Sequence, residues 1–278
     1  MPYLLMETET RGLSDMADKY IISVTKLTAI ADAIRAKTGG TDTLTADQMA
    51  AAIAGIKGES DSDTWCRKAI NQELSGDVKV PDDITALPPY LWYDNRSGKD
   101  TCVNSINLNN VKEVSESLFY TANYGALNSI TFTNAQRTIG KRAFYGAGIT
   151  ELTIPGNVKA IYDGAFNQCA YLQTVTFEPG DRITIYYYST FAYKKFFWTD
   201  PDAATLTVTF NRDVTFSSGT GVFSGRSGSI ILTTGGCMCT SGTFDGFTGK
   251  IYVPAAYLDK YKTGTNWSKY ADIIVASS

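Results

Sequence analysis

The sequence predicts a β-rich solenoid, in which parallel strands stack as a ladder joined by short helical or irregular returns, preceded by a small α-helical hairpin. An internal repeat predicts the solenoid. At five places an aliphatic residue is followed five positions later by a bulky aromatic residue: Leu87/Trp92, Val114/Phe119, Ile139/Phe144, Ile161/Phe166 and, least regularly, Tyr186/Phe191. Successive aromatics lie 22 to 27 residues apart, a period typical of one turn of a solenoid. Helical spacing between residues 25 and 56 predicts the hairpin.

Each unit carries a short aliphatic run after its aromatic residue, and this run predicts a strand. The clearest examples are residues 149–155 and 172–179. Leu152 and Ile154 are two positions apart and therefore point to one face, while Thr153 points to the other. Because one such unit cannot bury its apolar face alone, the units must stack with the aromatic residues between them.

The repeat resembles a known family. The segment "IGKRAFYGAGITELTIPGNVKAIYDGAFNQCAYLQTVTF" is similar to the BspA-type leucine-rich repeat, whose consensus has Ile-x-x-x-Ala-Phe, a leucine-rich strand, Ile-Pro and a Val-x-x-Ile turn. The match is strongest between Val111 and Pro179, and Phe223 and Phe244 mark degenerate turns after it. The resemblance implies a leucine-rich-repeat solenoid, whose function is to present a surface rather than to perform chemistry.

The hairpin has two short, alanine-rich helices separated by Gly39-Gly40. Thr45 and Gln48 have the spacing of a capping box, so the second helix is expected to begin near Ala46. Helices this short have little core of their own and need a partner or an oligomer. The candidate oligomerisation or docking residues are the apolar positions Leu27, Ile30, Ile34, Met49 and Ile53.

The hairpin also resembles a module of bacteriophage tail and fibre proteins that often precedes BspA-like repeats. Leu27, residues 30–38, Met49 and Ile53 carry the resemblance. Together the two resemblances imply a virion structural protein: a tail fibre, tail-tip or head-decorating protein. Its hairpin would bind other virion proteins, its array would bind a host-surface glycan or protein, and a homo-oligomer, by resemblance a trimer, would give multivalent binding.

The predicted organisation has four segments. These are an N-terminal helical anchor or oligomerisation module at 1–57, a polar linker at 58–70, the repeat array at 71–253 and a C-terminal cap at 254–278. The linker is expected to be flexible up to Thr64 and ordered again from Trp65. The cap is expected to contain a helix from Pro254 to Tyr261, with Trp267 and Tyr270 packing beside it.

Composition excludes several function classes. The chain has no histidine, so Ser-His-Asp and Cys-His catalysis, histidine-ligated zinc and histidine-ligated haem are unavailable. Its 25 basic residues are scattered among 28 acidic ones, which disfavours nucleic acid as a partner. The first twenty residues do not resemble a signal peptide, and no stretch is apolar enough to span a membrane. We therefore expect a non-enzymatic protein without cofactors, located on a virion assembled in the host cytoplasm.

The cysteines predict buried thiols rather than disulfides or a metal site. Cys66, Cys102 and Cys169 are far apart in the sequence. Cys237 and Cys239 would face the same way on a strand, but neither histidine nor a second cysteine pair is present to complete a zinc site.

One aromatic stretch, "ITIYYYSTFAYKKFFWTDPD", is the candidate receptor-binding surface. Its candidate residues are Tyr187, Tyr193, Lys194, Lys195, Phe196, Phe197 and Trp198. Aromatic faces beside charges suit a sugar ring or a protein partner, whereas the alternative is that these rings pack in the core, as Phe191 must. A second candidate surface is the hydroxyl- and amide-rich outward side of the strands: Asn128, Thr131, Thr133, Thr150, Thr153, Gln173, Thr174 and Thr176.

Two other functions remain open at this point. The same repeats fit a bacterial cell-surface adhesin, for which an export signal would be needed. They also fit a carboxylate-based glycan depolymerase, since paired carboxylates cleave glycosidic bonds without histidine. Asp163 and Glu178 fall in adjacent predicted turns, but neither lies in a motif that distinguishes a catalytic acid from a solvated carboxylate.

Overall fold

The computed structural model describes residues 61–71, 73–92, 103–120, 127–186, 189–194, 202–217 and 221–277. The chain divides into two compact units, residues 1–59 and 60–278, and the described residues belong to the second. The predicted hairpin, including Leu27, Ile30, Ile34, Met49 and Ile53, lies outside the described residues. No helix within the described ranges has the length and apolarity that crossing a membrane requires.

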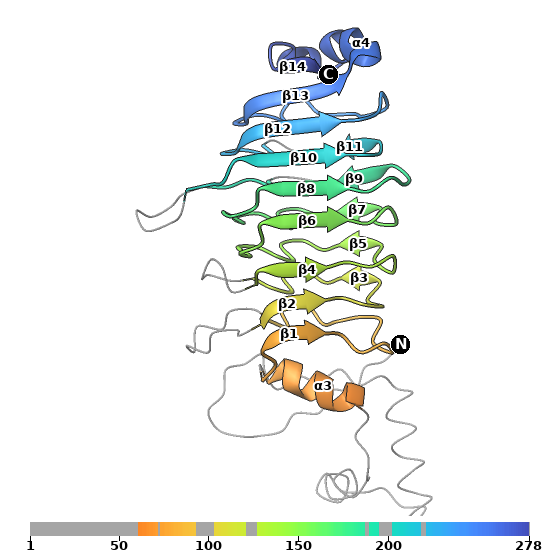
Figure 1. Cartoon of the computed structure of the whole chain (residues 1–278), viewed down its shortest axis with the longest axis vertical. Coiled ribbons are helices and arrows are strands. Elements are labelled where there is room, and N and C mark those ends of the chain that lie inside the picture. Colours follow the sequence, from red (N-terminus) through yellow and green to blue (C-terminus); the bar gives the residue numbers. More distant parts are fainter. Residues whose placement is uncertain are drawn as a thin grey trace, which may run out of the picture. The chain divides into compact units, whose positions relative to one another are not determined.

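The described unit is a ladder of parallel strands, as the repeat predicts (Figure 1). One face of the ladder contains β1 (Gly76–Lys79), β2 (Val103–Asn107), β4 (Ser129–Thr131), β6 (Glu151–Ile154), β8 (Thr174–Phe177), β10 (Leu206–Phe210), β12 (Ser227–Leu232), β13 (Thr248–Pro254) and β14 (Ile274–Ser277). We call this the long face. In the described part of the chain it forms a 3-stranded sheet, β1-β2-β4, and a 6-stranded sheet, β6-β8-β10-β12-β13-β14.

A second, narrower sheet forms the return face. It contains β3 (Glu113–Val114), β5 (Thr138–Ile139), β7 (Ala160–Ile161), β9 (Ile183–Ile185) and β11 (Val214–Phe216), paired in that order. Every strand pair on both faces is parallel. Each turn therefore consists of a long-face strand, a tight bend, a return-face strand and the loop with the aromatic residue.

The repeat aromatics form a continuous stack inside the ladder. Trp92, Phe119, Phe144, Phe166, Phe191, Phe223 and Phe244 are all buried. Neighbouring rings along this series lie 4.5 to 6.1 Å apart between centroids, with interplanar angles from 3° to 17°. The stack includes Phe223 and Phe244, so the turns that are degenerate in sequence keep the same core.

The fifth aliphatic position of the repeat is Ile185 rather than Tyr186. Ile185 pairs with Ile161 across β9 and β7 and is buried. Tyr186 is only partly buried and stacks on Tyr162, with ring centroids 5.1 Å apart. This turn thus has one more residue between its aliphatic and aromatic positions than the four turns before it. The five-residue spacing therefore pointed to Tyr186, the residue next to Ile185.

Part of the predicted linker is a helix. Helix α3 (Asp61–Ile70) lies beside β1, at the start of the described unit (Figure 1). Ala69 is buried in the core, and Trp65 packs edge-on against Trp92 with centroids 6.1 Å apart. The sequence predicted a flexible segment up to Thr64 and order from Trp65, whereas α3 already begins at Asp61. Its residues Trp65 and Ala69 pack against the core, and Trp65 covers the first aromatic ring of the stack.

The predicted cap contains helices and one further strand. The 3₁₀ helix η1 (Ala255–Tyr257), helix α4 (Leu258–Thr263) and the 3₁₀ helix η2 (Ser268–Tyr270) follow β13, and β14 then pairs in parallel with β13. Tyr261, Trp267 and Tyr270 are buried, as their pattern predicts. Trp267 and Tyr270 both contact Phe244, the last ring of the stack in the described part, at 5.6 and 5.2 Å.

Candidate functional site

The structure corrects the prediction for Tyr193 in the aromatic stretch. Tyr193 is only 6% exposed, and the guanidinium of buried Arg226 lies 5.5 Å from the centre of its ring. Its backbone N–H donates to the carbonyl of Ser224 in the next turn. The ring therefore belongs to the packed interior and does not offer a face to a receptor.

The other residues of the predicted receptor-binding surface are only partly described. Lys194 is exposed, and its backbone N–H and C=O are held by the side chain of buried Gln168 at 2.9 and 3.0 Å. Tyr187, Lys195, Phe196, Phe197 and Trp198 lie outside the described residues. Their role stays a prediction.

The cysteines in the described part are free and mostly buried. Cys169, Cys237 and Cys239 are buried and Cys66 is partly buried, while Cys102 lies outside the described residues. Burial raises the pKa of the Cys169 thiol to about 12. Within the described ranges there is no group of three acidic, histidine or cysteine side chains that could hold a metal ion.

The outward side of the long face carries two columns of polar side chains in register. In one column Thr153, Thr176 and Thr209 lie on successive strands, and in the other Glu151, Thr174, Thr207 and Ser229 do so. Strand spacing places neighbouring members of a column about 4.8 Å apart. We call this surface the hydroxyl face. All of these residues are exposed or partly exposed, because alternation sends their neighbours into the core.

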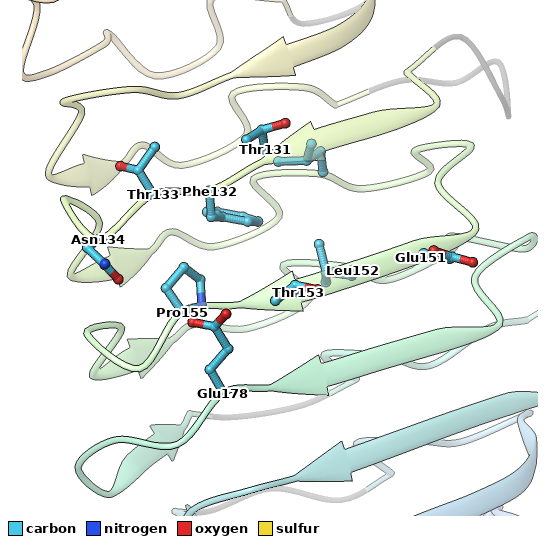
Figure 2. A pocket seen from close by; sticks show the side chains of 10 residues that line it. Thr131, Phe132, Thr133, Asn134, Glu151, Leu152, Thr153, Pro155 and Glu178 are labelled. Atoms are coloured by element: carbon cyan, nitrogen blue, oxygen red, sulfur yellow. The ribbon is translucent and has the colours of Figure 1, made fainter.

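The hydroxyl face is interrupted between β4 and β6. These strands follow one another in the ladder, but no hydrogen bonds pair them, whereas every other pair of neighbouring long-face strands in the described part is paired. On the return face β5 pairs with both β3 and β7. The ladder therefore opens on one face only. The opening is a groove of about 370 Å³ (Figure 2).

The groove is lined by residues of the two strands, of the bend after β4 and of the bends after β6 and β8. They are Ile130, Thr131, Phe132, Thr133, Asn134, Glu151, Leu152, Thr153, Pro155 and Glu178. Figure 2 shows Glu151 at one end of the groove and Glu178, with Pro155 and Asn134, toward the other end.

A buried glutamine lies in the turn where the ladder opens. Gln136 is 0% exposed and holds the position that Val111 and Val158 hold in the neighbouring Val-x-x-Ile turns. Its side-chain N–H groups donate to the carbonyls of Asn109 and Val111 at 3.0 and 2.6 Å. The hydroxyl of Thr133 also donates to the carbonyl of Asn109, at 2.6 Å. These bonds tie the bend after β4 to the preceding turn, while the side chain of Asn157 donates to the carbonyl of Asn134 at 2.9 Å and ties the same bend to the following turn.

The floor of the groove is an incompletely covered core residue. Phe132 continues the inward row of β4 and packs edge-on against Phe144 at 5.9 Å. It is only partly buried, whereas Leu108 and Ile154, at the corresponding positions of β2 and β6, are fully buried. The missing strand pairing thus uncovers an aromatic ring that the regular ladder would enclose.

Charges around the groove are acidic. Glu151 and Glu178 are both exposed, and the lining residues include no lysine or arginine. Within the described residues, two arginines lie behind lining residues. The guanidinium of Arg137 donates to the carbonyl of Asn134 at 2.7 Å, and Arg212 is buried behind the bend after β6. Its two terminal nitrogens donate to the carbonyls of Pro155, Gly156 and Val158 at 2.8 to 3.1 Å. Burial lowers the pKa of Arg212 to about 10, while the charge of Glu178 acts in the opposite direction.

The two carboxylates of the groove are exposed, and the remaining lining offers groups that can hold a ligand. A general acid for glycoside cleavage needs an environment that raises its pKa, most simply burial. Glu151 and Glu178 are exposed at separate ends of the groove, and Asp163 is not among the lining residues. The groove instead offers an aromatic floor, hydroxyl groups and an amide on its rim, which are groups that hold a ligand in place.

Sequence reasoning found part of this site. Thr131, Thr133, Thr153 and Glu178 were recognised as exposed polar residues, but not as the rim of one groove. The groove itself was missed. Gln136 was its signal, since a polar residue at the valine position of a Val-x-x-Ile turn must either be exposed or find buried hydrogen-bond partners.

The repeat region is similar to known repeats. Residues 77–197 match the profile of the BspA type leucine rich repeat region, in 6 copies. The chain is similar to a leucine-rich repeat protein from Bacteroides ovatus ATCC 8483 of known crystal structure, at 16% sequence identity and a TM-score of 0.31. That similarity covers 66% of this chain and 56% of the other, so it spans little more than half of that protein. No curated protein matches the sequence. Residues 77–197 are therefore similar to BspA-type leucine-rich repeats, and the described unit is a parallel-strand solenoid of leucine-rich-repeat type.

Proposed function

We propose that this protein is a recognition protein of a phage virion that binds a host-surface glycan through its repeat array. The observation that carries the glycan-binding part is the hydroxyl face. Thr153, Thr176 and Thr209 repeat at the spacing of a rigid ladder, so several hydroxyl groups are held in line at once. A polysaccharide is itself a periodic polymer of hydroxyl groups and can make many weak contacts with such a row.

The virion part of the proposal rests on resemblance. Residues 27–53 resemble the helical module of phage tail and fibre proteins, and the repeats follow it in the same chain. In this arrangement the N-terminal module holds several arrays on one particle, and weak individual sites gain strength through effective concentration. The adhesin alternative uses the same array on a bacterial surface and differs only in how the array is anchored.

The test is retention of the purified full-length chain on a panel of immobilised bacterial surface polysaccharides. The key variant is Thr207→Lys/Thr209→Lys, which places two bulky cations in the middle of the hydroxyl face on β10. Thr184→Lys on β9 is the matched control, because Thr184 is partly exposed on the return face. We expect at least one polysaccharide to retain the chain, and the double variant to weaken that retention by about tenfold or more, as expected when multivalent contacts are lost.

Two outcomes would contradict the proposal. If no polysaccharide retains the chain, the array does not recognise glycans, and binding to trypsin-treated against untreated host cells would then identify a protein receptor. If the double variant and Thr184→Lys are retained like the unmodified chain, the hydroxyl face is not the binding surface.

A further inference from the structure

We infer that the groove between β4 and β6 is a subsite for one non-acidic sugar unit, a neutral hexose or a hexosamine. This inference rests on the proposed glycan recognition and specifies where a single unit binds and which sugars are accepted. The groove lies where the hydroxyl face is interrupted, between β4 and β6, and Glu151 and Thr153 of that face line it. A polysaccharide chain bound along the hydroxyl face would therefore reach the groove. The groove volume of about 370 Å³ is near the lower limit of small-molecule sites, which start at about 300 Å³.

The floor of the groove provides the apolar contact that a sugar ring needs. A pyranose has C–H groups on its faces and hydroxyl groups around its edge, so it is held by an aromatic surface below and polar groups beside it. Phe132 is the only aromatic residue in the lining and remains partly exposed there. The Pro155 ring lies in the same lining, beside Glu178 (Figure 2).

The rim supplies hydrogen bonds from both strands. Thr131 on β4 and Thr153 on β6 carry hydroxyl groups on opposite sides of the groove. The main chain of β6 adds to them. The carbonyls of Thr150 and Ile154 accept hydrogen bonds from β8, so by alternation the N–H and C=O groups of Thr153 face β4 across the groove. These groups have no strand partner there, because β4 and β6 are not paired.

The charges select against acidic sugars. Glu151 and Glu178 place two carboxylates at the groove, and no lysine or arginine lines it. The terminal nitrogens of Arg212 are used by three backbone carbonyls and are not available to a ligand. Arg137 is outside the lining, and one of its terminal nitrogens donates to the carbonyls of Asn134, Ala135 and Gln136. A uronic or sialic acid would therefore meet like charges within the lining itself. A protonated amine would gain a charge-assisted hydrogen bond.

The experiment is calorimetric titration of the full-length chain with three tetrasaccharides of similar length: chitotetraose, its deacetylated glucosamine tetramer and tetragalacturonate. We expect both the neutral and the amine tetramers to bind at least about tenfold more tightly than the acidic one, because the two carboxylates of the groove repel galacturonate. A charge-assisted hydrogen bond from a protonated amine strengthens the binding of the glucosamine tetramer further. Thr153→Lys fills the groove and abolishes binding, whereas Thr184→Lys on the return face leaves it unchanged.

A conservative variant tests the charge argument without altering shape. We expect Glu178→Gln to lower the preference for the glucosamine tetramer over chitotetraose by about tenfold. The control is Glu113→Gln, which should leave this preference unchanged because Glu113 is exposed on β3 of the return face. Tight binding of tetragalacturonate, or equal binding by Thr153→Lys and Thr184→Lys, would overturn this inference. If polysaccharides still retain the chain in that case, the proposed function stands and only the subsite is wrong. If neither polysaccharides nor tetrasaccharides bind, both fail.

Discussion

Three buried polar side chains in the described part of this ladder donate hydrogen bonds to backbone carbonyls of earlier turns. Gln136 ties the bend after β4 to the preceding turn, and Arg212 and Arg226 each reach carbonyls two turns back. The Nε of Arg226, for example, donates to the carbonyl of Phe191 at 3.0 Å while its terminal nitrogens reach Ala170 and Cys169. A buried guanidinium needs such partners because its desolvation is otherwise uncompensated.

Buried thiols are expected to lower the stability of the folded ladder at alkaline pH. Burial raises the pKa of the Cys169 thiol from 9.0 to about 12, and the pKa of Cys239 is raised in the same way. Above pH 9 the unfolded chain loses these protons while the folded chain retains them, so stability is complete below pH 9 and falls as pH rises toward 12. Cys169 alone is expected to lower the free energy of unfolding by about 1.4 kcal/mol between pH 8 and pH 10.

Urea unfolding at pH 8, 9 and 10 measures this effect. The range stops at pH 10 because Arg212 has a pKa of about 10 in the folded chain. Above that pH the folded chain loses this proton before the unfolded chain does, which raises the free energy of unfolding and opposes the effect of the thiols. Cys169→Ala should be less stable at pH 8, because it leaves a cavity, but its stability should depend less on pH. Equal unfolding free energies of the unmodified chain at pH 8 and pH 10 would show that the thiol is not shielded in this way.

At the scale of elements, the backbone of one turn limits the residues of the next. Gly225 has a φ of +74°, and a Cβ placed there would lie 1.9 Å from the carbonyl oxygen of Tyr193 in the preceding turn. Gly76 has nearly the same conformation, with a φ of +69°, but a Cβ there would meet nothing within 4 Å. Alanine variants of the two glycines can therefore distinguish two costs. Gly76→Ala has only the strain of a left-handed backbone, whereas Gly225→Ala has that strain and a clash with the adjacent turn.

We expect Gly76→Ala to cost about 1 to 2 kcal/mol, the price of a left-handed residue with a side chain. Gly225→Ala should lose at least about 2 kcal/mol more, because the adjacent turn must move to remove the clash. Thermal and urea unfolding of both variants measure the difference. Similar losses in the two variants would mean that the ladder adjusts its turn spacing easily.

The elements differ in how far they were predictable. The alternation of β6 and β8 follows directly from Leu152, Ile154 and the threonine between them, and the structure confirms it. Helix α3 was not predicted, because its polar sequence gives little sign that Trp65 covers Trp92. The missing pairing of β4 with β6 was not predicted either, since strand pairing depends on contacts between turns that the alternation within one turn does not contain.

At the scale of the whole molecule, residues 60–278 form a compact unit with their own core, covered on one side by α3. A chain beginning at Ser60 should therefore keep its melting temperature to within about 2 °C, which corresponds to less than about 1 kcal/mol. Its mass should fall to that of a monomer if residues 1–59 form the oligomer, as the hairpin residues predict.

Light scattering of the full-length and shortened chains makes this measurement, with calorimetry to verify that the array is folded. An oligomer that survives removal of residues 1–59 would contradict the anchoring role of the hairpin and place self-association in the array. A full-length chain that is monomeric would leave docking to another protein as the role of that module.

The sequence by itself determined the solenoid, the period of its turns and the residues that stack in its core, because each turn buries its own aromatic residue against copies of the same pattern. It also determined which threonines face outward, since strand alternation is local. Only the tertiary structure decided that Tyr193 is buried, that α3 covers the first ring of the stack and that the ladder opens at β4. Those features depend on contacts between neighbouring turns, such as Thr133 with Asn109 and Arg226 with Tyr193, which lie 24 and 33 positions apart in the sequence. No local sequence pattern encodes such contacts.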